Sequence, residues 1–130
     1  MSSHERNAHA GLAALLVLQG IMLGSLYAGV APHPPAATPL FGIGPFLGAA
    51  LAAAVAALCL GPSTTIAGRM LACAAALMAL VSFGPQKYFD AQFALIWPAV
   101  LSGQIAAVSV LVSVFRRASQ HGSSEASNVT

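Results

Sequence analysis

The polar residues that could carry chemistry are concentrated in one short stretch, GPQKYFDAQFALIWP, at residues 84–98. It holds the only lysine, the only aspartate and the only tryptophan of the chain, which are Lys87, Asp90 and Trp97. A carboxylate and an ammonium group in one site can serve acid–base chemistry or bind a charged ligand. The same residue types also mark the interface of a membrane helix, where aromatic rings and charges meet the lipid headgroups.

Little else in the sequence supports catalysis or metal binding. A membrane enzyme would need Asp90, Lys87 and His33 to meet at one surface, and no nucleophile or ligand set accompanies them. The histidines lie outside the apolar segments, and the two cysteines form no CxxC pair. If Met1 is removed, His4 becomes the third residue and could help to bind Cu(II), but so short a motif often occurs by chance. We therefore expect no enzyme activity, no catalytic residues, no cofactor and no metal site.

Composition limits the class of protein more strongly. The 130-residue chain is 58% hydrophobic and 6% charged, whereas a soluble domain carries about 25% charged residues. A water-exposed surface with so few charges would aggregate, so most of the surface must face lipid. The net charge of +2 and the lack of a basic run in an exposed domain argue against nucleic-acid binding.

Four apolar segments predict an all-α fold, an integral membrane bundle of four transmembrane helices with short loops. They cover residues 10–30, 40–60, 66–84 and 91–115, and about 20 apolar residues suffice to cross the hydrocarbon core. The first segment is longer than the 7–15 residues typical of a signal peptide, so we expect it to be retained. The chain thus forms a single membrane domain over residues 10–115.

Polar tails flank this domain, at residues 1–9 and at the Ser-rich residues 116–130, which we expect to be disordered. The distribution of Lys and Arg predicts the orientation, because positive charges remain cytoplasmic. Four cations, at positions 6, 69, 116 and 117, fall on one side of a four-span bundle, and Lys87 falls on the other. We therefore predict a multi-pass protein of a bacterial inner membrane, with both termini cytoplasmic and the loops 31–39 and 84–90 outside.

Small residues at every fourth position are candidates for the helix contacts, because lipid gives no hydrophobic reward for association and close backbone approach replaces it. The longest such strip lies in the second segment, and the alanine-rich third segment could show the spacing by chance. The strips favour a compact four-helix bundle, but they could equally dock onto a larger partner. The strips are Gly20, Gly24 and Ala28; Gly44, Gly48, Ala52 and Ala56; Ala72 and Ala76; and Gly103 and Ala107.

Two glutamines, Gln19 and Gln104, interrupt the apolar segments about ten residues from the cytoplasmic ends. At about 1.5 Å per residue both lie near the middle of the membrane, where an amide needs a partner. We predict that they form a structural polar pair across a contact between the first and fourth helices. Alternatively, each bonds a backbone carbonyl or a neighbouring subunit, or the two line a permeation path with Ser102 and Ser109.

Structural roles can be predicted for most conspicuous residues of the stretch 84–98. Gly84-Pro85 should stop the third helix. Asp90 should cap the fourth by accepting the amide of Gln92 or Phe93. Pro98 should kink this helix, because it removes one amide and clashes with a preceding carbonyl.

The aromatic residues around the cap form a collar that is either a membrane anchor or a docking face. Phe89, Phe93 and Trp97 recur every four residues and should line one face of the fourth helix, with Tyr88 beside them. The candidate collar therefore comprises Tyr88, Phe89, Asp90, Phe93 and Trp97.

These features favour a membrane protein without a catalytic site, an accessory, assembly or scaffold subunit that packs against other membrane helices. The alternative is a small homo-oligomeric transporter or channel. In length and helix number the chain is similar to the small multidrug-resistance exporters, whose hallmark is a membrane-embedded glutamate in the first helix. Residues 10–30 contain no glutamate, so the residue that would imply such transport is missing. The expected partners are the lipid bilayer and other membrane subunits or further copies of the chain.

Overall fold

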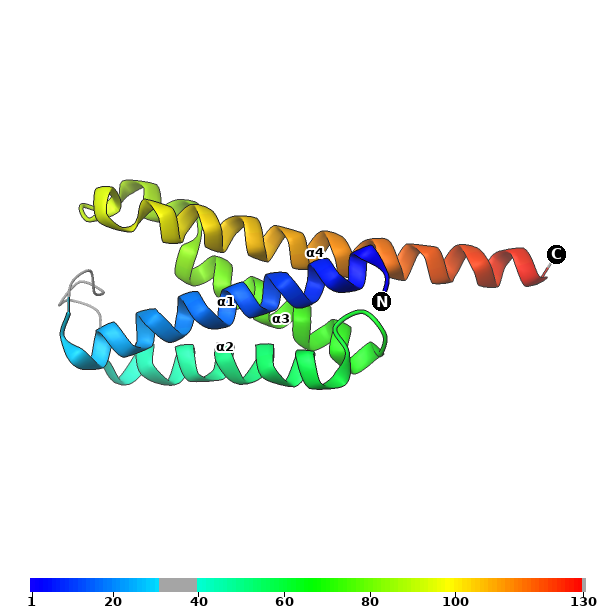
Figure 1. Ribbon diagram of the computed structural model, residues 1–130, viewed down its shortest axis with the longest axis horizontal. Helices are drawn as coiled ribbons and strands as arrows, with labels where there is room; N and C mark the ends of the chain where they lie inside the picture. The colour runs from blue at the N-terminus through cyan, green and yellow to red at the C-terminus, as the bar shows by residue number, and fades with distance from the viewer. Residues whose placement is uncertain (31–39, 130) are drawn as a thin grey trace.

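The computed structural model describes residues 1–30 and 40–129, and most of these residues lie in helices (Figure 1). The loop expected at residues 31–39, which includes His33, lies outside the described residues. In chain order the elements are α1 (Ser3–Ala28), α2 (Leu40–Leu60), α3 (Ile66–Phe83), the 3₁₀ helix η1 (Pro85–Phe89) and α4 (Phe93–Val129).

Local capping residues fix the ends of α1. The Ser2 hydroxyl accepts a hydrogen bond from the Glu5 amide at 3.3 Å and so satisfies one of the free N–H groups of the first turn. At the other end, Gly29 adopts a left-handed φ of 66° and its amide bonds to the Ser25 carbonyl. Glycine suits this position because a side chain would strain a left-handed conformation.

The turn between α2 and α3 is held by Thr65. Its hydroxyl donates to the Leu60 carbonyl and accepts from the Gly68 amide, both at 2.9 Å. One side chain thus closes the end of α2 and caps the start of α3. Gly61 provides the reversal between them, with a φ of 84°.

The four long helices form a bundle in which α1 packs against α4 and α2, and α3 packs against α2 and α4 (Figure 1). Long helices that follow one another in the chain run in opposite directions (Figure 1). We name the two ends of the bundle by their residues. The arginine end contains the N-terminus, the α2–α3 turn and Arg6, Arg69, Arg116 and Arg117. The collar end contains η1 and the start of α4.

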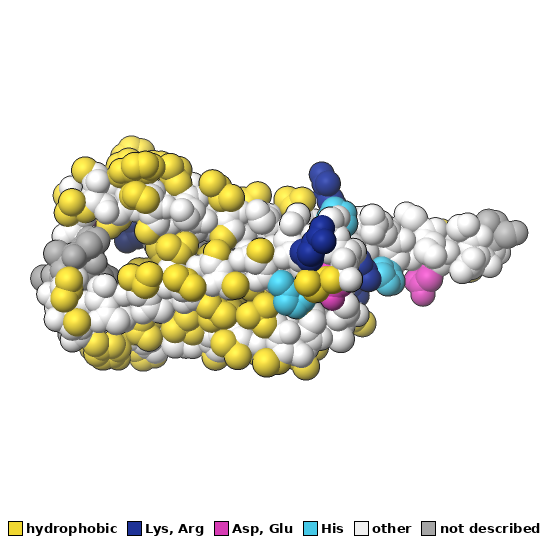
Figure 2. All heavy atoms as spheres, viewed as in Figure 1, with side chains coloured by type: hydrophobic (Ala, Val, Ile, Leu, Met, Phe, Trp, Pro, Cys, Tyr) yellow, Lys and Arg dark blue, Asp and Glu magenta, His cyan; other side chains and the backbone are white. Residues whose placement is uncertain are grey.

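The core of the bundle is made mainly of alanine, and the large apolar side chains point outward. Alanines of α2, α3 and α4 are fully or almost fully buried, together with a few larger residues such as Leu12, Leu15 and Val110. In contrast, side chains such as Phe41, Val81 and Ile105 are mostly exposed. Yellow side chains accordingly cover much of the face drawn in Figure 2. This inside-out distribution suits a bundle surrounded by lipid, where exposed apolar side chains carry no penalty.

Within the described residues, four helices are long and apolar enough to cross a membrane, as judged by length and composition. The all-helical fold and the number of candidate spans predicted from sequence are therefore confirmed.

The tails differ from the expectation. Helix α1 starts at Ser3 rather than near residue 10, and α4 continues to Val129 through the segment expected to be disordered. Serine hydroxyls support this extension, because Ser119 donates to the Phe115 carbonyl at 3.2 Å and Ser123 to the Ser119 carbonyl at 3.1 Å. The segment also contains no proline that would break a helix.

Candidate functional site

Local geometry at the collar end agrees with the roles predicted for the turn residues. Helix α3 stops at Phe83, and Gly84-Pro85 leads directly into η1. The carboxylate of Asp90 accepts the amide of Gln92 at 2.9 Å, which confirms the predicted cap. Asp90 also lies 3.7 Å from the ammonium of Lys87. The two charges thus hold the turn together, and Lys87 has a partner of its own. Helix α4 runs without interruption through Pro98.

A hydrogen-bonded chain that the sequence did not reveal ties η1 to α4. The hydroxyl of Tyr88 donates to Oε1 of Gln104 at 2.9 Å, and Nε2 of Gln104 donates to the carbonyl of Phe83 at 2.9 Å. Gln104 therefore satisfies the last carbonyl of α3 and anchors the collar aromatic at the same time. Such a carbonyl would otherwise be left without a partner at the helix end.

The aromatic side chains of the collar divide into two groups. The rings of Tyr88 and Phe93 pack against each other at a tilt of 52°, with centroids 5.2 Å apart. Phe89 lies in η1 rather than on α4, so the predicted stripe of three aromatics is reduced to Phe93 and Trp97. Phe89 is 92% exposed and Trp97 49% exposed. An anchor or docking face at this end therefore depends mainly on these two side chains.

The predicted pair of glutamines is not formed among the residues that the structure describes. Gln104 is engaged with Phe83 and Tyr88, as described above. Gln19 is 1% exposed, and its amide nitrogen has no hydrogen-bond partner in the described residues. The alternative, a bond to a backbone carbonyl, is instead confirmed for Gln104, whose amide donates to Phe83.

The small-residue strips divide between the inside and the outside of the bundle. The strips of α3 and α4 are buried, and a Cβ added to Gly103 would lie 2.7 Å from Cγ of Phe83. In contrast, Gly20, Gly24 and Gly48 are exposed, with open space where a Cβ would be. We call the outward-facing positions the outer strips: Gly20, Gly24 and Ala28 of α1, and Gly48 and Ala52 of α2. Helix α2 instead buries the face that carries Leu47, Ala50, Ala54 and Ala57.

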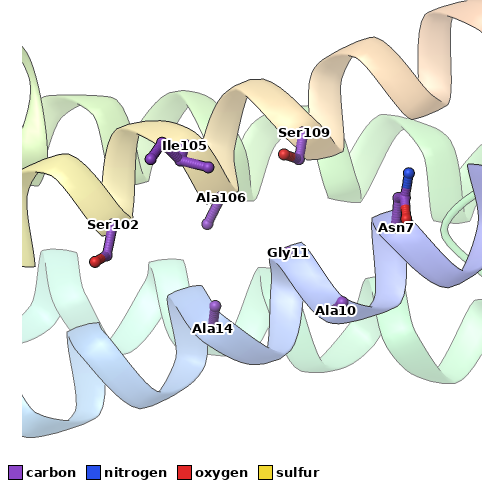
Figure 3. Close-up of a pocket in the computed structure, with 8 residues that line it drawn as sticks. All are labelled: Asn7, Ala10, Gly11, Ala14, Ser102, Ile105, Ala106 and Ser109. Carbon is purple, nitrogen blue, oxygen red and sulfur yellow. The ribbon is translucent and has the colours of Figure 1, made fainter.

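A groove of about 340 Å³ runs along the outer face between α1 and α4 (Figure 3). The two helices approach closely at its floor, because a Cβ on Gly11 would lie 2.9 Å from the carbonyl oxygen of Ala106. Its lining is mostly apolar and small, with three polar side chains distributed along its length. The lining residues are Asn7, Ala10, Gly11, Ala14, Ser102, Ile105, Ala106 and Ser109.

Positive charge gathers at the arginine end, as Figure 2 shows around the N-terminus. The guanidinium of Arg117 donates to the Ser2 hydroxyl at 3.0 Å, so it lies at the N-terminus of α1. Its Nε is buried and has no hydrogen-bond partner. In residues 1–30 and 40–129 the one ion pair is Lys87–Asp90 at the opposite end, so none of the arginines has a carboxylate within 4.0 Å.

Arg116 and Arg117 do not lie at the C-terminus of α4, where they could compensate the helix dipole, because the helix continues beyond them for another three turns. Their charges therefore need another explanation. No three His, Cys, Asp or Glu side chains of the described residues come close enough together to hold a metal ion.

Together, the fold and these surfaces define a small all-helical protein with four candidate membrane spans. No family model, no curated protein and no solved structure matches the chain.

Proposed function

We propose that this protein is an accessory or assembly subunit of a membrane complex, which binds other membrane helices through the outer strips of α1 and α2. The proposal rests on one observation above all: α1 and α2 each carry a glycine-containing face that points away from the core. Gly20, Gly24 and Gly48 have no neighbouring atom within 4 Å of an added Cβ.

Glycine is a poor choice for a helix face that meets only lipid, because it weakens the helix by about 1 kcal/mol relative to alanine. It is a good choice where another helix must come close, since a smooth strip permits backbone contact. The outer strips are thus best explained by a partner helix that occupies them. The exposed rings of Phe89 and Trp97 would extend this contact at the collar end.

The positions of the polar side chains favour this proposal over a transporter. From the sequence, the lining of a permeation path would consist of Gln19, Gln104, Ser102 and Ser109. Gln19 is buried in the bundle and Gln104 is bonded to Tyr88 and Phe83, whereas the two serines border the outer groove. These groups thus lie in three separate environments. The spans also lack the buried ionisable residue that transporters generally use.

The test is affinity purification of the tagged full-length protein from native membranes. We expect partner subunits to co-purify with the wild type. The variant Ala52→Leu places a branched side chain in the outer strip of α2. A lost helix contact of about 1 kcal/mol should lower the partner yield about fivefold.

Ala49→Leu is the matched control, since Ala49 is also exposed on α2 but lies outside the strip. It should leave the yield unchanged. If both variants retain the partners equally, the outer strip is not the contact. A wild-type protein that purifies only as a defined homo-oligomer would favour the transporter instead.

A further inference from the structure

We propose that the groove between α1 and α4 binds one anionic phospholipid, with its phosphate at Arg116 and Arg117 and an acyl chain along the apolar floor. This site is separate from the outer strips and does not depend on the proposed function. The argument combines the shape of the groove, the order of its lining and the unpaired charges at its end.

The order of residues along the groove matches the order of groups in a phospholipid. Arg116 follows Ser109 by seven residues, just as Ser109 follows Ser102. Seven residues make nearly two turns, so Arg116 continues the grooved face of α4 about 10 Å beyond Ser109. The cations at the arginine end are thus followed by Asn7 and Ser109 of the groove. Farther from that end, Figure 3 shows Ala10, Ala14 and Ile105, with Ser102 last.

Each part of this order has a chemical counterpart in the lipid. Guanidinium groups bind phosphate oxygens through paired N–H bonds. The amide of Asn7 and the hydroxyl of Ser109 can donate to the ester carbonyls beneath the phosphate. In the described part of the chain the hydroxyl of Ser109 makes no hydrogen bond, whereas the hydroxyls of Ser119 and Ser123, farther along α4, donate to carbonyls of their own helix. The hydroxyl of Ser109 is thus free for a ligand.

The unpaired arginines at the arginine end favour the binding of an anion. The guanidinium of Arg117 lies at the N-terminus of α1, which is the positive end of the helix dipole. A positive side chain therefore faces a positive helix end. The four arginines have no carboxylate partner among the described residues. The nearby Nε of Arg117 is buried without an acceptor. Basic pockets between membrane helices are typical sites for anionic headgroups.

The dimensions and lining of the groove suit an acyl chain. It has a volume of about 340 Å³, and it is about 10 Å long between Ser102 and Ser109. Small lining residues such as Ala10 and Ala14 leave a smooth channel that suits a hydrocarbon chain.

The experiment measures lipid binding to the purified, delipidated full-length protein by native mass spectrometry. Phosphatidylglycerol is titrated against phosphatidylcholine, and we expect the wild type to prefer phosphatidylglycerol. Arg116→Gln should weaken this binding about fivefold, and the double substitution with Arg117→Gln about twenty-five-fold, at about 1 kcal/mol per arginine. Arg69→Gln, which removes the same charge from α3 at the same end of the bundle, should have little effect.

A second pair of variants tests the groove itself. Ala14→Leu fills the channel and should abolish the preference, whereas Ala13→Leu, at the next exposed position of α1, should not. Equal binding of both lipids, or equal effects of the matched variants, would overturn the proposal. If inorganic phosphate displaces the lipid and Ala14→Leu does not change lipid binding, the arginines bind a free anion and the groove is not a lipid site. Occupation of the groove by a second copy would appear as a lipid-independent dimer, and would also overturn it.

Discussion

At the scale of single residues, the contact between Phe83 and Gly103 decides how closely α3 and α4 approach. The ring of Phe83 lies over Gly103, and an added Cβ would come within 2.7–2.9 Å of its ring and Cβ atoms. Real side-chain atoms do not tolerate such separations, so the helices would have to move apart. The same movement would strain the bond between Gln104 and the Phe83 carbonyl.

Gly103→Ala should therefore lower the free energy of unfolding by about 1–3 kcal/mol, the usual cost of overpacking. The measurement is reversible unfolding of the purified protein in detergent. Gly20→Ala is the control, because nothing lies within 4 Å of its added Cβ. Alanine has a higher helix propensity than glycine, so this variant should be as stable as the wild type or more stable by up to about 1 kcal/mol. Equal destabilisation by both changes would contradict the contact.

The residue scale also shows which site features sequence can reveal. Asp90 was predicted correctly because its acceptor role involves an amide only two residues away. The partners of Gln104 were not predicted, because Tyr88 and Phe83 lie beside it only after the chain has reversed direction. Its membrane depth indicated that it needed a partner, but the identity of that partner depended on the path of the chain.

At the scale of elements, α4 has two parts with different support. Up to Arg117 it contacts α1 and α3, whereas residues 118–129 are all exposed. A helical segment without tertiary contacts is marginal in water, because most helical stability in proteins comes from packing of an apolar face. The sequence shows that residues 118–129 are polar, but it did not predict that they continue helix α4.

Hydrogen exchange should separate the two parts of α4. We expect the amides of residues 118–129 to exchange near the rate of an unstructured peptide, and those of residues 103–114 to be strongly protected. Mass spectrometry of the protein in detergent, after proteolysis, resolves both segments. Strong protection of residues 118–129 would contradict this expectation and indicate a further contact for the tail.

The element scale also explains why the sequence left open which strips lie inside the bundle. Sequence spacing identifies a smooth face on each helix, but it does not say which face meets which neighbour. In α2 the face with Ala50, Ala54 and Ala57 is equally small, and this face is the buried one. An alanine-rich helix therefore offers more than one smooth face, and the fold uses one while another remains outside.

At the scale of the whole molecule, the asymmetry of charge predicts an orientation. Four arginines lie at one end of the bundle and Lys87, paired with Asp90, at the other. Positive charges are retained on the cytoplasmic side, so the arginine end should be cytoplasmic. This inference needs only sequence and the number of helices, which is why it could be made before the structure.

Cysteine labelling tests the orientation. In a variant without Cys59 and Cys73, a cysteine replaces either Thr64, in the exposed α2–α3 turn, or Phe89, in η1. A membrane-impermeant maleimide added to intact cells should label Phe89→Cys and leave Thr64→Cys unlabelled until the membrane is opened. The opposite pattern would reverse the proposed topology.

The alanine core has a consequence for the entropy of assembly. Alanine has no rotamers to lose on burial, whereas a leucine or methionine gives up side-chain freedom when it is packed. Here the buried contacts of α2, α3 and α4 are mostly alanine, and side chains such as Leu77, Met70 and Val81 remain exposed. The four helices can thus come together while their flexible side chains keep moving in the fluid hydrocarbon around them.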